Sequence, residues 1–262
     1  MSAALITGAS TGIGRELARL FAADGVDVVV VSSKRSIAEL TSLAEELGAR
    51  HGIRVDPITM DLAQPGAGAD LVARIDALGV EIEYLVNNAG VGILGLTVQD
   101  SDPDAVSRMV QLNVVTTTDL TLLYAPRMVK AGRGAILNVG SVAAYVIPHG
   151  LEAGYAASKA YVRSFSECVA HDLRGTGVTC THLAPGPTRT EFMGTAGLGD
   201  TSRLDRYFSD AETVAKAGYA AMRAGRVNVV PGVGTKIMRV MSAVSPSRRL
   251  VGDLSGRFVS RH

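Results

Sequence analysis

Hydrophobic, strand-like stretches alternate with amphipathic, helix-like stretches along almost the whole chain. The valine-rich run at residues 26–32 has the unbroken hydrophobicity of a strand covered on both faces. Parallel strands need a crossover between them, and the alternation supplies a helix for each. The sequence therefore predicts an α/β fold, a doubly wound parallel sheet of about seven strands with helices on both faces. We expect strands at residues 3–7, 26–32, 54–60, 84–87, 134–139, 178–183 and 227–230, and helices at 14–23, 36–51, 70–78, 103–131, 155–174 and 210–224.

Composition excludes several classes of protein. The chain has 262 residues, with 26 basic and 25 acidic side chains, so it lacks the basic surplus of a nucleic-acid-binding protein. Cys168 and Cys180 have no metal-ligand spacing, and we expect two thiols in a reducing compartment and no metal. No signal peptide or membrane span is visible, which predicts a cytoplasmic protein. No linker or composition break divides the chain, which predicts a single domain over residues 1–262.

A glycine-rich turn follows the first predicted strand and opens the first helix. Residues 7–14 read Thr-Gly-Ala-Ser-Thr-Gly-Ile-Gly. A pyrophosphate can approach a helix N-terminus where side chains are absent, and there it meets free N–H groups and the positive end of the helix dipole. Gly8 would allow the tight turn, Gly12 the close approach, and Gly14 the packing of helix against strand. A simple tight turn is the alternative, but the strand–turn–helix context favours dinucleotide binding and a Rossmann fold.

Several motifs after this turn resemble the short-chain dehydrogenase/reductase family. The turn has the spacing T-G-x-x-x-G-x-G, and the motifs follow in family order over residues 1 to about 190. They are Asn87-Asn88-Ala89-Gly90 after the fourth strand, Asn113 in the long helix, Ser141 after the fifth strand, Tyr155-x-x-x-Lys159, and Pro185-Gly186-Pro187-Thr188 after the sixth. The resemblance implies a nicotinamide dinucleotide as cofactor and a homodimer or homotetramer as the assembly. It implies cofactor contacts from Gly8, Ser10, Thr11, Gly12, Ile13, Gly14, Asp61, Leu62, Asn88, Ala89, Gly90, Tyr155, Lys159, Pro185, Gly186 and Thr188.

Tyr155 and Lys159 are the predicted reacting pair. Four residues apart in a helix, they project from one face. A tyrosine with its ordinary pKa near 10 is a poor base at neutral pH, and a neighbouring ammonium together with the oxidised nicotinamide would lower that pKa. The resemblance adds that Ser141 bonds the substrate oxygen, that Lys159 also binds the nicotinamide ribose, and that Asn113 holds a water relaying protons. The alternatives are a helix-surface Tyr–Lys pair, a serine that caps a turn, and an asparagine satisfied by backbone groups.

The end of the second predicted strand bears on the choice of cofactor. NAD-selective enzymes place a carboxylate there, to bond the ribose hydroxyls of adenosine. This chain instead has Ser32-Ser33-Lys34-Arg35, two hydroxyls and two cations that suit a 2′-phosphate, with Ser33, Lys34 and Arg35 as the expected contacts. The sequence therefore predicts NADP(H) as the preferred cofactor, with NAD(H) as the alternative if the cations only cap a solvated turn.

The remaining predictions concern the substrate and the tail. Hydrophobic segments at 91–94, 143–147 and 190–208 follow strand ends, where ligands bind in such sheets, and favour a hydrophobic ketone, aldehyde or alcohol. We expect a substrate loop at about 187–208, with an ordinary surface loop as the alternative. The basic tail, about 233–262, is expected to pack over the pocket or against another subunit rather than lie on a membrane. A non-catalytic dinucleotide sensor or scaffold protein on the same fold is the competing function.

Overall fold

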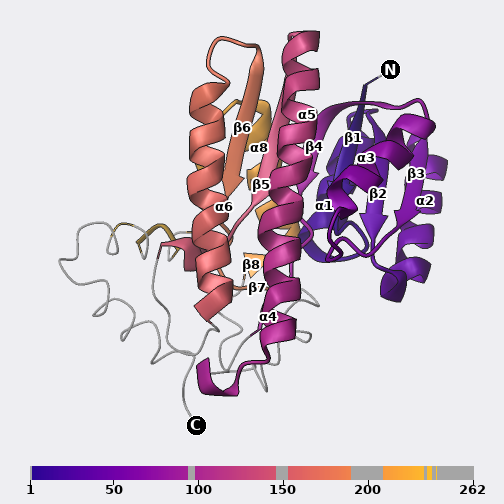
Figure 1. The fold of residues 1–262 in the computed structure, drawn as a ribbon. Coiled ribbons are helices and arrows are strands. Elements are labelled where there is room, and N and C mark those ends of the chain that lie inside the picture. The colour runs from indigo at the N-terminus through magenta and orange to yellow at the C-terminus, as the bar shows by residue number, and fades with distance from the viewer. Residues whose placement is uncertain are drawn as a thin grey trace.

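A seven-stranded parallel sheet forms the centre of the molecule, in the order β3-β2-β1-β4-β5-β6-β9. The computed structural model describes residues 2–93, 98–145, 153–189, 209–232, 235–237 and 240 (Figure 1). The strands are β1 (Ser2–Thr7), β2 (Asp27–Ser32), β3 (Val55–Thr59), β4 (Glu81–Asn87), β5 (Gly134–Val139), β6 (Val178–Leu183) and β9 (Asn228–Val229). The predicted doubly wound α/β fold is confirmed.

Helices cover both faces of the sheet. They are α1 (Gly12–Ala23), α2 (Ile37–His51), α3 (Ala67–Ala77), α4 (Pro103–Val110), α5 (Thr117–Ala131), α6 (Ala153–Asp172) and α8 (Ala211–Arg223). Short 3₁₀ helices are η1 (Lys34–Ser36), η2 (Val98–Asp100) and η4 (Val142–Ala144). In Figure 1, α5 and α6 cover the near face and α8 lies behind β6. This layering places the carboxyl ends of neighbouring strands along one edge, where ligands bind in open α/β sheets.

Alternate residues of each strand point into two hydrophobic cores. Ile6 and Val30 pack with Phe21 of α1 and Leu47 of α2 on one face. Leu5 and other residues of the opposite face pack with α3 and α5. Burial of each large core side chain stabilises the fold by about 1.5–3 kcal/mol. This packing on both faces fixes the positions of the strand ends.

Two predicted elements differ markedly from the observed ones, and one observed sheet was not predicted. The long helix expected at 103–131 is divided by a π-helical turn, η3 (Gln111–Thr116), between α4 and α5. The fourth strand begins at Glu81 rather than at residue 84. Its first residues include the exposed Glu81 and the half-buried Glu83, so they lack the hydrophobicity that marks the buried end of the strand. A second, two-stranded parallel sheet joins β7 (Thr188–Arg189) to β8 (Ser209–Asp210), which the sequence did not predict. Most of the predicted substrate loop and tail lies outside the described residues.

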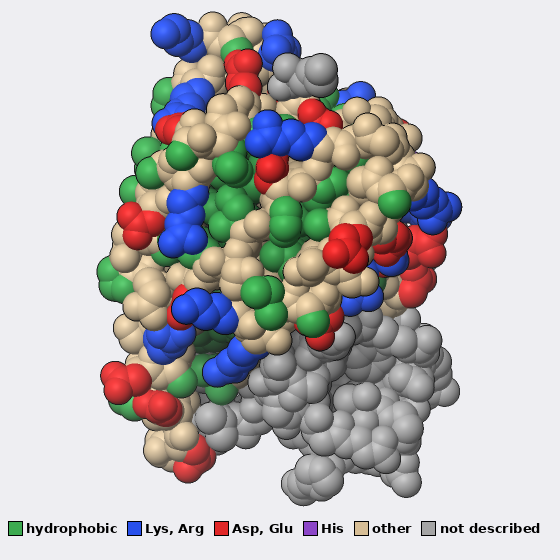
Figure 2. All heavy atoms as spheres, turned by 90° about the vertical axis from the view of Figure 1, so that its right-hand side faces the viewer, with side chains coloured by type: hydrophobic (Ala, Val, Ile, Leu, Met, Phe, Trp, Pro, Cys, Tyr) green, Lys and Arg blue, Asp and Glu red, His purple; other side chains and the backbone are tan. Residues whose placement is uncertain are grey.

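The surface seen in Figure 2 mixes charges of both signs. Acidic and basic side chains lie interspersed, with hydrophobic side chains between them. None of the helices in the described part of the chain has the length and hydropathy needed to cross a bilayer. Within the same residues, no group of three or more His, Cys, Asp or Glu side chains could hold a metal ion.

Candidate active site

The glycine turn is locked to the end of β4 by hydrogen bonds. The Thr7 hydroxyl accepts from the backbone N–H groups of Asn88 and Ala89, at 3.0 Å each. The Asn88 side-chain amide donates to the carbonyl oxygens of Thr7 and Gly8, at 2.9 and 3.0 Å. Gly8 has φ +66°, and a Cβ there would lie 2.9 Å from the Ala89 Cα. The strand ends β1 and β4 are therefore one unit, and the predicted tight turn at Gly8 is confirmed.

Gly14 lets α1 pack directly on the turn. A Cβ at this position would lie 2.2 Å from the Gly8 carbonyl oxygen, a distance that no real contact allows. The first turn of α1 has neither a capping side-chain bond from Thr11 nor an acidic residue. The backbone N–H groups of this first helical turn lie beside Ser10, Thr11 and Gly12, and neither a Thr11 cap nor an acidic side chain accepts hydrogen bonds from them. That is the environment a phosphate needs.

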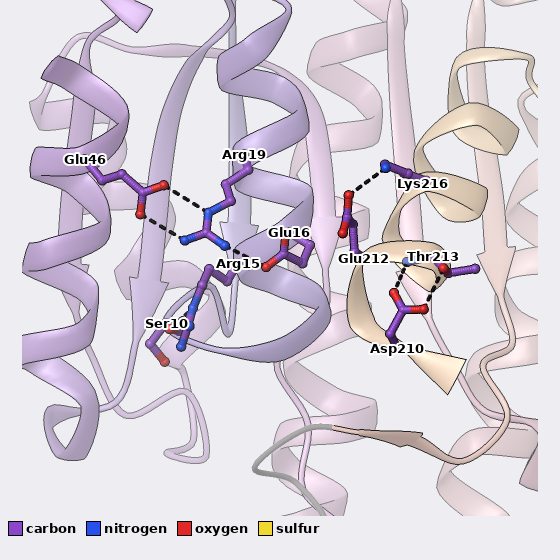
Figure 3. Close-up of polar contacts among 9 residues, drawn as sticks. All are labelled: Ser10, Arg15, Glu16, Arg19, Glu46, Asp210, Glu212, Thr213 and Lys216. Carbon is purple, nitrogen blue, oxygen red and sulfur yellow. Dashed lines mark hydrogen bonds and ion pairs between the residues drawn. The ribbon is translucent and has the colours of Figure 1, made fainter. Parts of the chain in front are cut away.

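Two arginines of α1 hold the surroundings of the turn. Arg15 donates to the Ser10 carbonyl oxygen at 2.9 Å. Arg19 forms a bidentate pair with Glu46 of α2, at 3.1 and 2.9 Å, and also bonds Glu16 (Figure 3). Half-exposed ion pairs of this kind contribute little stability, but they fix α1 against α2 beside the turn. Figure 3 also shows Asp210 capping α8 through Thr213.

The π-helical turn presents Asn113 to the end of β4. The Asn113 carboxamide accepts from the Val91 N–H at 3.0 Å and donates to the Val91 carbonyl oxygen at 2.9 Å. It also donates to the Ser158 hydroxyl of α6 at 3.2 Å. A π-turn often marks a functional position, because its extra residue re-aims a side chain. The alternative of backbone satisfaction therefore describes Asn113 in part, although its backbone partners belong to another segment.

Tyr155 and Lys159 lie buried together on α6. Their exposed fractions are 7% and 6%, and the Lys159 Nζ is 5.9 Å from the centre of the Tyr155 ring. Nζ donates to the Val139 carbonyl oxygen at 3.2 Å, at the end of β5. Burial lowers the pKa of Lys159 to about 8, because desolvation disfavours the ammonium. A Cβ on Gly90 would lie 3.4 Å from this ammonium, which places the end of β4 beside the pair.

The surroundings that the chain itself supplies raise the pKa of Tyr155. Burial raises it, and a hydrogen bond from the Ser141 side chain lowers it by less. Desolvation of the phenolate therefore dominates in the chain alone, whereas the lowering that we expect involves the oxidised nicotinamide as well as the ammonium. The phenol is protonated at neutral pH, which is the form that can donate a proton.

Ser141 follows β5 on a segment fixed to β6. The flanking N–H groups of Gly140 and Val142 donate to the carbonyl oxygens of Leu183 and Pro185, at 2.7 and 2.8 Å. The Ser141 hydroxyl accepts from the Ala143 N–H at 3.1 Å. The turn-capping alternative is thus realised, and the same hydroxyl also bonds Tyr155.

The end of β2 differs from these buried groups. Ser33, Lys34 and Arg35 are exposed, and Lys34 and Arg35 lie in η1. The backbone of the glycine turn reaches this strand, since the Ala9 N–H donates to the Val31 carbonyl oxygen at 3.1 Å. The structure therefore brings the basic segment to the same sheet edge as the turn.

The outer cofactor residues lie along the same edge. Asp61 pairs with Arg108 at 3.0 Å, and the carbonyl oxygen of Leu62 accepts from Thr116 at 2.7 Å. A Cβ on Gly186 would lie 2.6 Å from the Thr235 hydroxyl oxygen, and the Thr188 hydroxyl bonds the Gly186 carbonyl at 2.9 Å. Ile13 is half-buried and packs on the core.

Sequence reasoning missed two residues that hold the site. Thr7 and Ser158 each bond a predicted site residue, and each directly precedes one in the chain. Their positions beside Gly8 and Lys159 were the available signal. Ser158 also donates to the Tyr155 carbonyl oxygen at 2.7 Å, which orients the helix turn that carries both reacting groups.

A hydrophobic wall surrounds Tyr155. Met109 and Ala143 are buried against it, with Ile93 and Val106 partly buried beside them. Of the predicted substrate segments, 91–93 and 143–145 are described, whereas Leu94, 146–147 and 190–208 lie outside the described residues.

Comparison with known proteins identifies the family. Residues 2–199 match the model described as short chain dehydrogenase. The chain belongs to this family. It is 35% identical over 232 residues to sulfoacetaldehyde reductase 2 of Chromohalobacter salexigens, covering 86% of this chain and 90% of that protein. The protein is thus an oxidoreductase of the type that acts on alcohol and carbonyl groups.

Solved structures of this family superpose on nearly the whole chain. A short-chain dehydrogenase from Sphingobium yanoikuyae in complex with NADPH has a TM-score of 0.82 and 31% identity, covering 93% of each chain. A bulky-bulky ketone specific alcohol dehydrogenase from Comamonas testosteroni has a TM-score of 0.76 and 28% identity, covering 94% of this chain and 96% of that one.

Proposed function

We propose that this short-chain dehydrogenase is an NADP(H)-dependent reductase that interconverts hydrophobic ketones or aldehydes and their alcohols, with Tyr155 as the general acid and base. The observation that carries the proposal is the buried pair of Tyr155 and Lys159 beside Ser141, at the sheet edge that also holds the glycine turn. A helix-surface pair would be exposed, and this pair is not.

The glycine turn fits a dinucleotide pyrophosphate. The first turn of α1 has no side-chain cap, and Gly8 to Gly14 leave its N–H groups accessible from the sheet edge. Lys159 has three donors and gives one to Val139, so it can bond the hydroxyls of the nicotinamide ribose. Asn88, Ala89 and Gly90 would support the cofactor at the end of β4. The nicotinamide supplies or accepts the hydride when it is bound.

The chain's own residues would manage the proton. Tyr155, protonated because burial raises its pKa, would donate to the carbonyl oxygen of the substrate during reduction. Ser141 would bond the same oxygen and hold it within reach of the phenol. Lys159 would stabilise the phenolate that forms, since its ammonium lies near the ring. Asn113 would hold the end of β4 and support a water that returns the proton to Tyr155 through Lys159.

The exposed segment after β2 supports NADP(H) over NAD(H). Ser33, Lys34 and Arg35 provide a hydroxyl and two cations where an NAD-selective site has a carboxylate. Charge-assisted bonds to a 2′-phosphate contribute about 1.5–3 kcal/mol each, so one bond suffices for a tenfold preference. The NADPH complex of the relative from Sphingobium yanoikuyae also supports this choice.

The hydrophobic wall supports an apolar substrate. Ile93, Val106, Met109 and Ala143 would contact the carbon skeleton on either side of the carbonyl. The relative from Comamonas testosteroni, described as specific for bulky-bulky ketones, supports the same class. A sulfonated aldehyde, suggested by the relative from Chromohalobacter salexigens, is the competing substrate, and its sulfonate would need a cation in addition to Lys159, which we assign to the cofactor ribose.

Exposed hydrophobic residues support a homodimer or homotetramer. Leu122, Leu123 and Val129 of α5 and Tyr161 of α6 are 57%, 36%, 37% and 40% exposed. Both helices lie on the near face in Figure 1. Apolar side chains gathered on neighbouring helices are typical of a subunit contact.

The decisive test is NADPH oxidation with a panel of bulky apolar ketones, aldehydes and sulfoacetaldehyde. We expect turnover of the bulky apolar compounds and little of the sulfonate. Tyr155→Phe should lower kcat by about 10³-fold, with NADPH affinity within about twofold of wild type, since only the proton donor is lost. Tyr161→Phe, which removes an exposed hydroxyl on the same helix, is the matched control and should keep wild-type kcat.

Two outcomes would contradict the proposal. NADPH binding without turnover of any carbonyl compound would favour the sensor or scaffold function. Turnover by Tyr155→Phe close to that of wild type would remove Tyr155 from the chemistry.

A further inference from the structure

A buried histidine lies behind Ser141 and is not used by the proposed chemistry. His182, on β6, is fully buried, and its imidazole faces the backbone of Gly140. A Cβ on Gly140 would lie 2.1 Å from the His182 Nε2 and 2.9 Å from its Cδ2. The imidazole therefore occupies the space that any side chain at position 140 would take. Gly140 directly precedes Ser141, so the ring packs against the peptide that leads into it.

A chain of polar contacts holds the imidazole in place. The His182 Nδ1 lies 3.1 Å from the Asn228 side-chain oxygen, on β9. The Asn228 amide nitrogen donates to Glu167 at 3.0 Å, and Glu167 pairs with Arg163 at 3.1 Å, both on α6. Because the Asn228 amide nitrogen is committed to Glu167, its oxygen must accept from Nδ1. The imidazole thus carries its proton on Nδ1 and presents an unprotonated Nε2 to Gly140.

The surroundings keep this imidazole neutral. Burial, the largest effect, lowers the pKa of His182 to about 4, and the charges of Arg163 and Lys159 act in the same direction. Asn228 and Glu167 act in the opposite direction by less. The Arg163 guanidinium also lies 4.2 Å from the centre of the Tyr145 ring, so the network reaches the residue that ends η4.

We propose that His182 is a positioning residue for Ser141, which fixes the Gly140–Ser141 peptide by filling the space beside Gly140. The backbone bonds of Gly140 and Val142 to β6 set the direction of this segment. The imidazole sets the distance between the Gly140–Ser141 peptide and β6, because the ring cannot move without breaking the contact with Asn228. The inference rests on the proposed function, since it assumes that Ser141 acts on the substrate oxygen. A displacement of about 1 Å in such a group can cost about 100-fold in rate.

A double-mutant cycle tests the proposal on the full-length enzyme. The variants are Gly140→Ala, His182→Val and the double variant, with kcat, ketone KM, NADPH affinity and melting temperature measured for each. We expect Gly140→Ala to lower kcat about 30- to 100-fold, with NADPH affinity nearly unchanged. His182→Val should lower kcat about fivefold, because the peptide loses its support. In the double variant the added methyl should cost nothing further, so its kcat should equal or exceed that of His182→Val.

The control variant is Gly48→Ala, whose new methyl would meet its nearest atom at 3.8 Å. It should leave kcat, ketone KM and NADPH affinity near wild type and should not lower the melting temperature, because alanine favours a helix more than glycine does. The inference would be overturned if Gly140→Ala lowered kcat by the same factor in the wild-type enzyme and in the His182→Val variant. A lowered melting temperature with unchanged kcat would also overturn it, because that pattern belongs to a purely structural role.

The cycle separates failure of this inference from failure of the proposed function. A wild-type enzyme that reduces ketones, combined with additive variants, refutes only the positioning role. A wild-type protein that binds NADPH and reduces no carbonyl compound refutes the proposed function and, with it, the role of Ser141. In that case the melting temperatures of wild type, the two single variants and the double variant still show whether a methyl group at position 140 and the His182 imidazole compete for the same space.

Discussion

The two sides of the proposed dinucleotide site are built differently. On the side of β1 and β4, Thr7, Asn88 and Gly14 interlock through short bonds and a contact that excludes even a methyl group. On the side of β2, Ser33, Lys34 and Arg35 are exposed. The first group would bind the pyrophosphate, which both dinucleotides share. The second group would contact the adenosine ribose, where NADP carries a 2′-phosphate and NAD does not. Substitutions in the exposed segment would therefore change the preferred dinucleotide without disturbing the fold. Substitutions in the interlocked group would change dinucleotide binding and the fold together.

Gly14→Ala should break the interlocked side and have the largest effect. The new methyl would overlap the Gly8 carbonyl oxygen, so α1 must move away from the turn. We expect NADPH affinity to fall by more than about 100-fold, with a melting temperature several degrees lower. Fluorescence titration with NADPH measures the first, and thermal unfolding the second. Gly48→Ala, at an uncrowded helix position, should leave NADPH affinity unchanged and should not lower the melting temperature. A dissociation constant within threefold of wild type would show that the turn tolerates a side chain.

Acid should destabilise the fold through His182, which lies on β6 beyond the interlocked strands β1 and β4. The folded protein keeps this imidazole neutral down to about pH 4, whereas the unfolded chain binds a proton near pH 6.5. Stability from this group is therefore present above pH 6.5 and is lost as the pH falls to 4, by about 3 kcal/mol. Urea unfolding at several pH values should show a steeper loss for wild type than for His182→Val. His171→Gln, at an exposed histidine, should follow wild type. Parallel curves for His182→Val and wild type would contradict the assignment.

Asn113→Ala should loosen the junction between β4 and α6. The change removes three hydrogen bonds of a buried side chain and leaves the backbone groups of Val91 unpaired. We expect a loss of about 2–4 kcal/mol in unfolding free energy and a kcat lowered by more than about tenfold. Ser107→Ala, an exposed change on α4, is the matched control. If the variant keeps wild-type kcat, Asn113 has only a structural role.

Ser33→Asp should act on the exposed side alone. A carboxylate at this position would repel a 2′-phosphate and bond the ribose hydroxyls of NAD. We expect the ratio of kcat/KM for NADPH to that for NADH to fall by about tenfold or more, with an unchanged melting temperature. Ser42→Asp adds the same charge to an exposed position of α2 and should leave the ratio as it is. An unaltered ratio in Ser33→Asp would mean that the segment does not meet the 2′-phosphate.

The sequence predicted what depends on local pattern. The uninterrupted valines of β2 and the glycine turn between β1 and α1 carry their own periodicity and spacing, and both appear where expected. Tyr155 and Lys159 share a helix face because they are four positions apart. The roles assigned to these residues stay predictions, as does the single domain.

What the sequence did not predict depends on contacts between distant residues. The π-turn contains Asn113, whose carboxamide bonds Val91, twenty-two positions away, and hydrophobic periodicity gives no sign of such a contact. The raised pKa of Tyr155 comes from burial by Met109 and Ala143, which belong to other segments. The two-residue strands β7 and β8 are too short to show any periodicity.

The pairing of β7 with β8 has an evolutionary consequence. Thr188 lies beside Ser209, so the chain leaves the sheet edge and returns to it at almost the same point. Insertions, deletions or wholesale replacement between these two anchors need not shift the register of the main sheet, because loop closure costs grow only slowly with length. The segment that we expect to contact the substrate can therefore change in length and sequence while Tyr155 and Lys159 stay in place on α6.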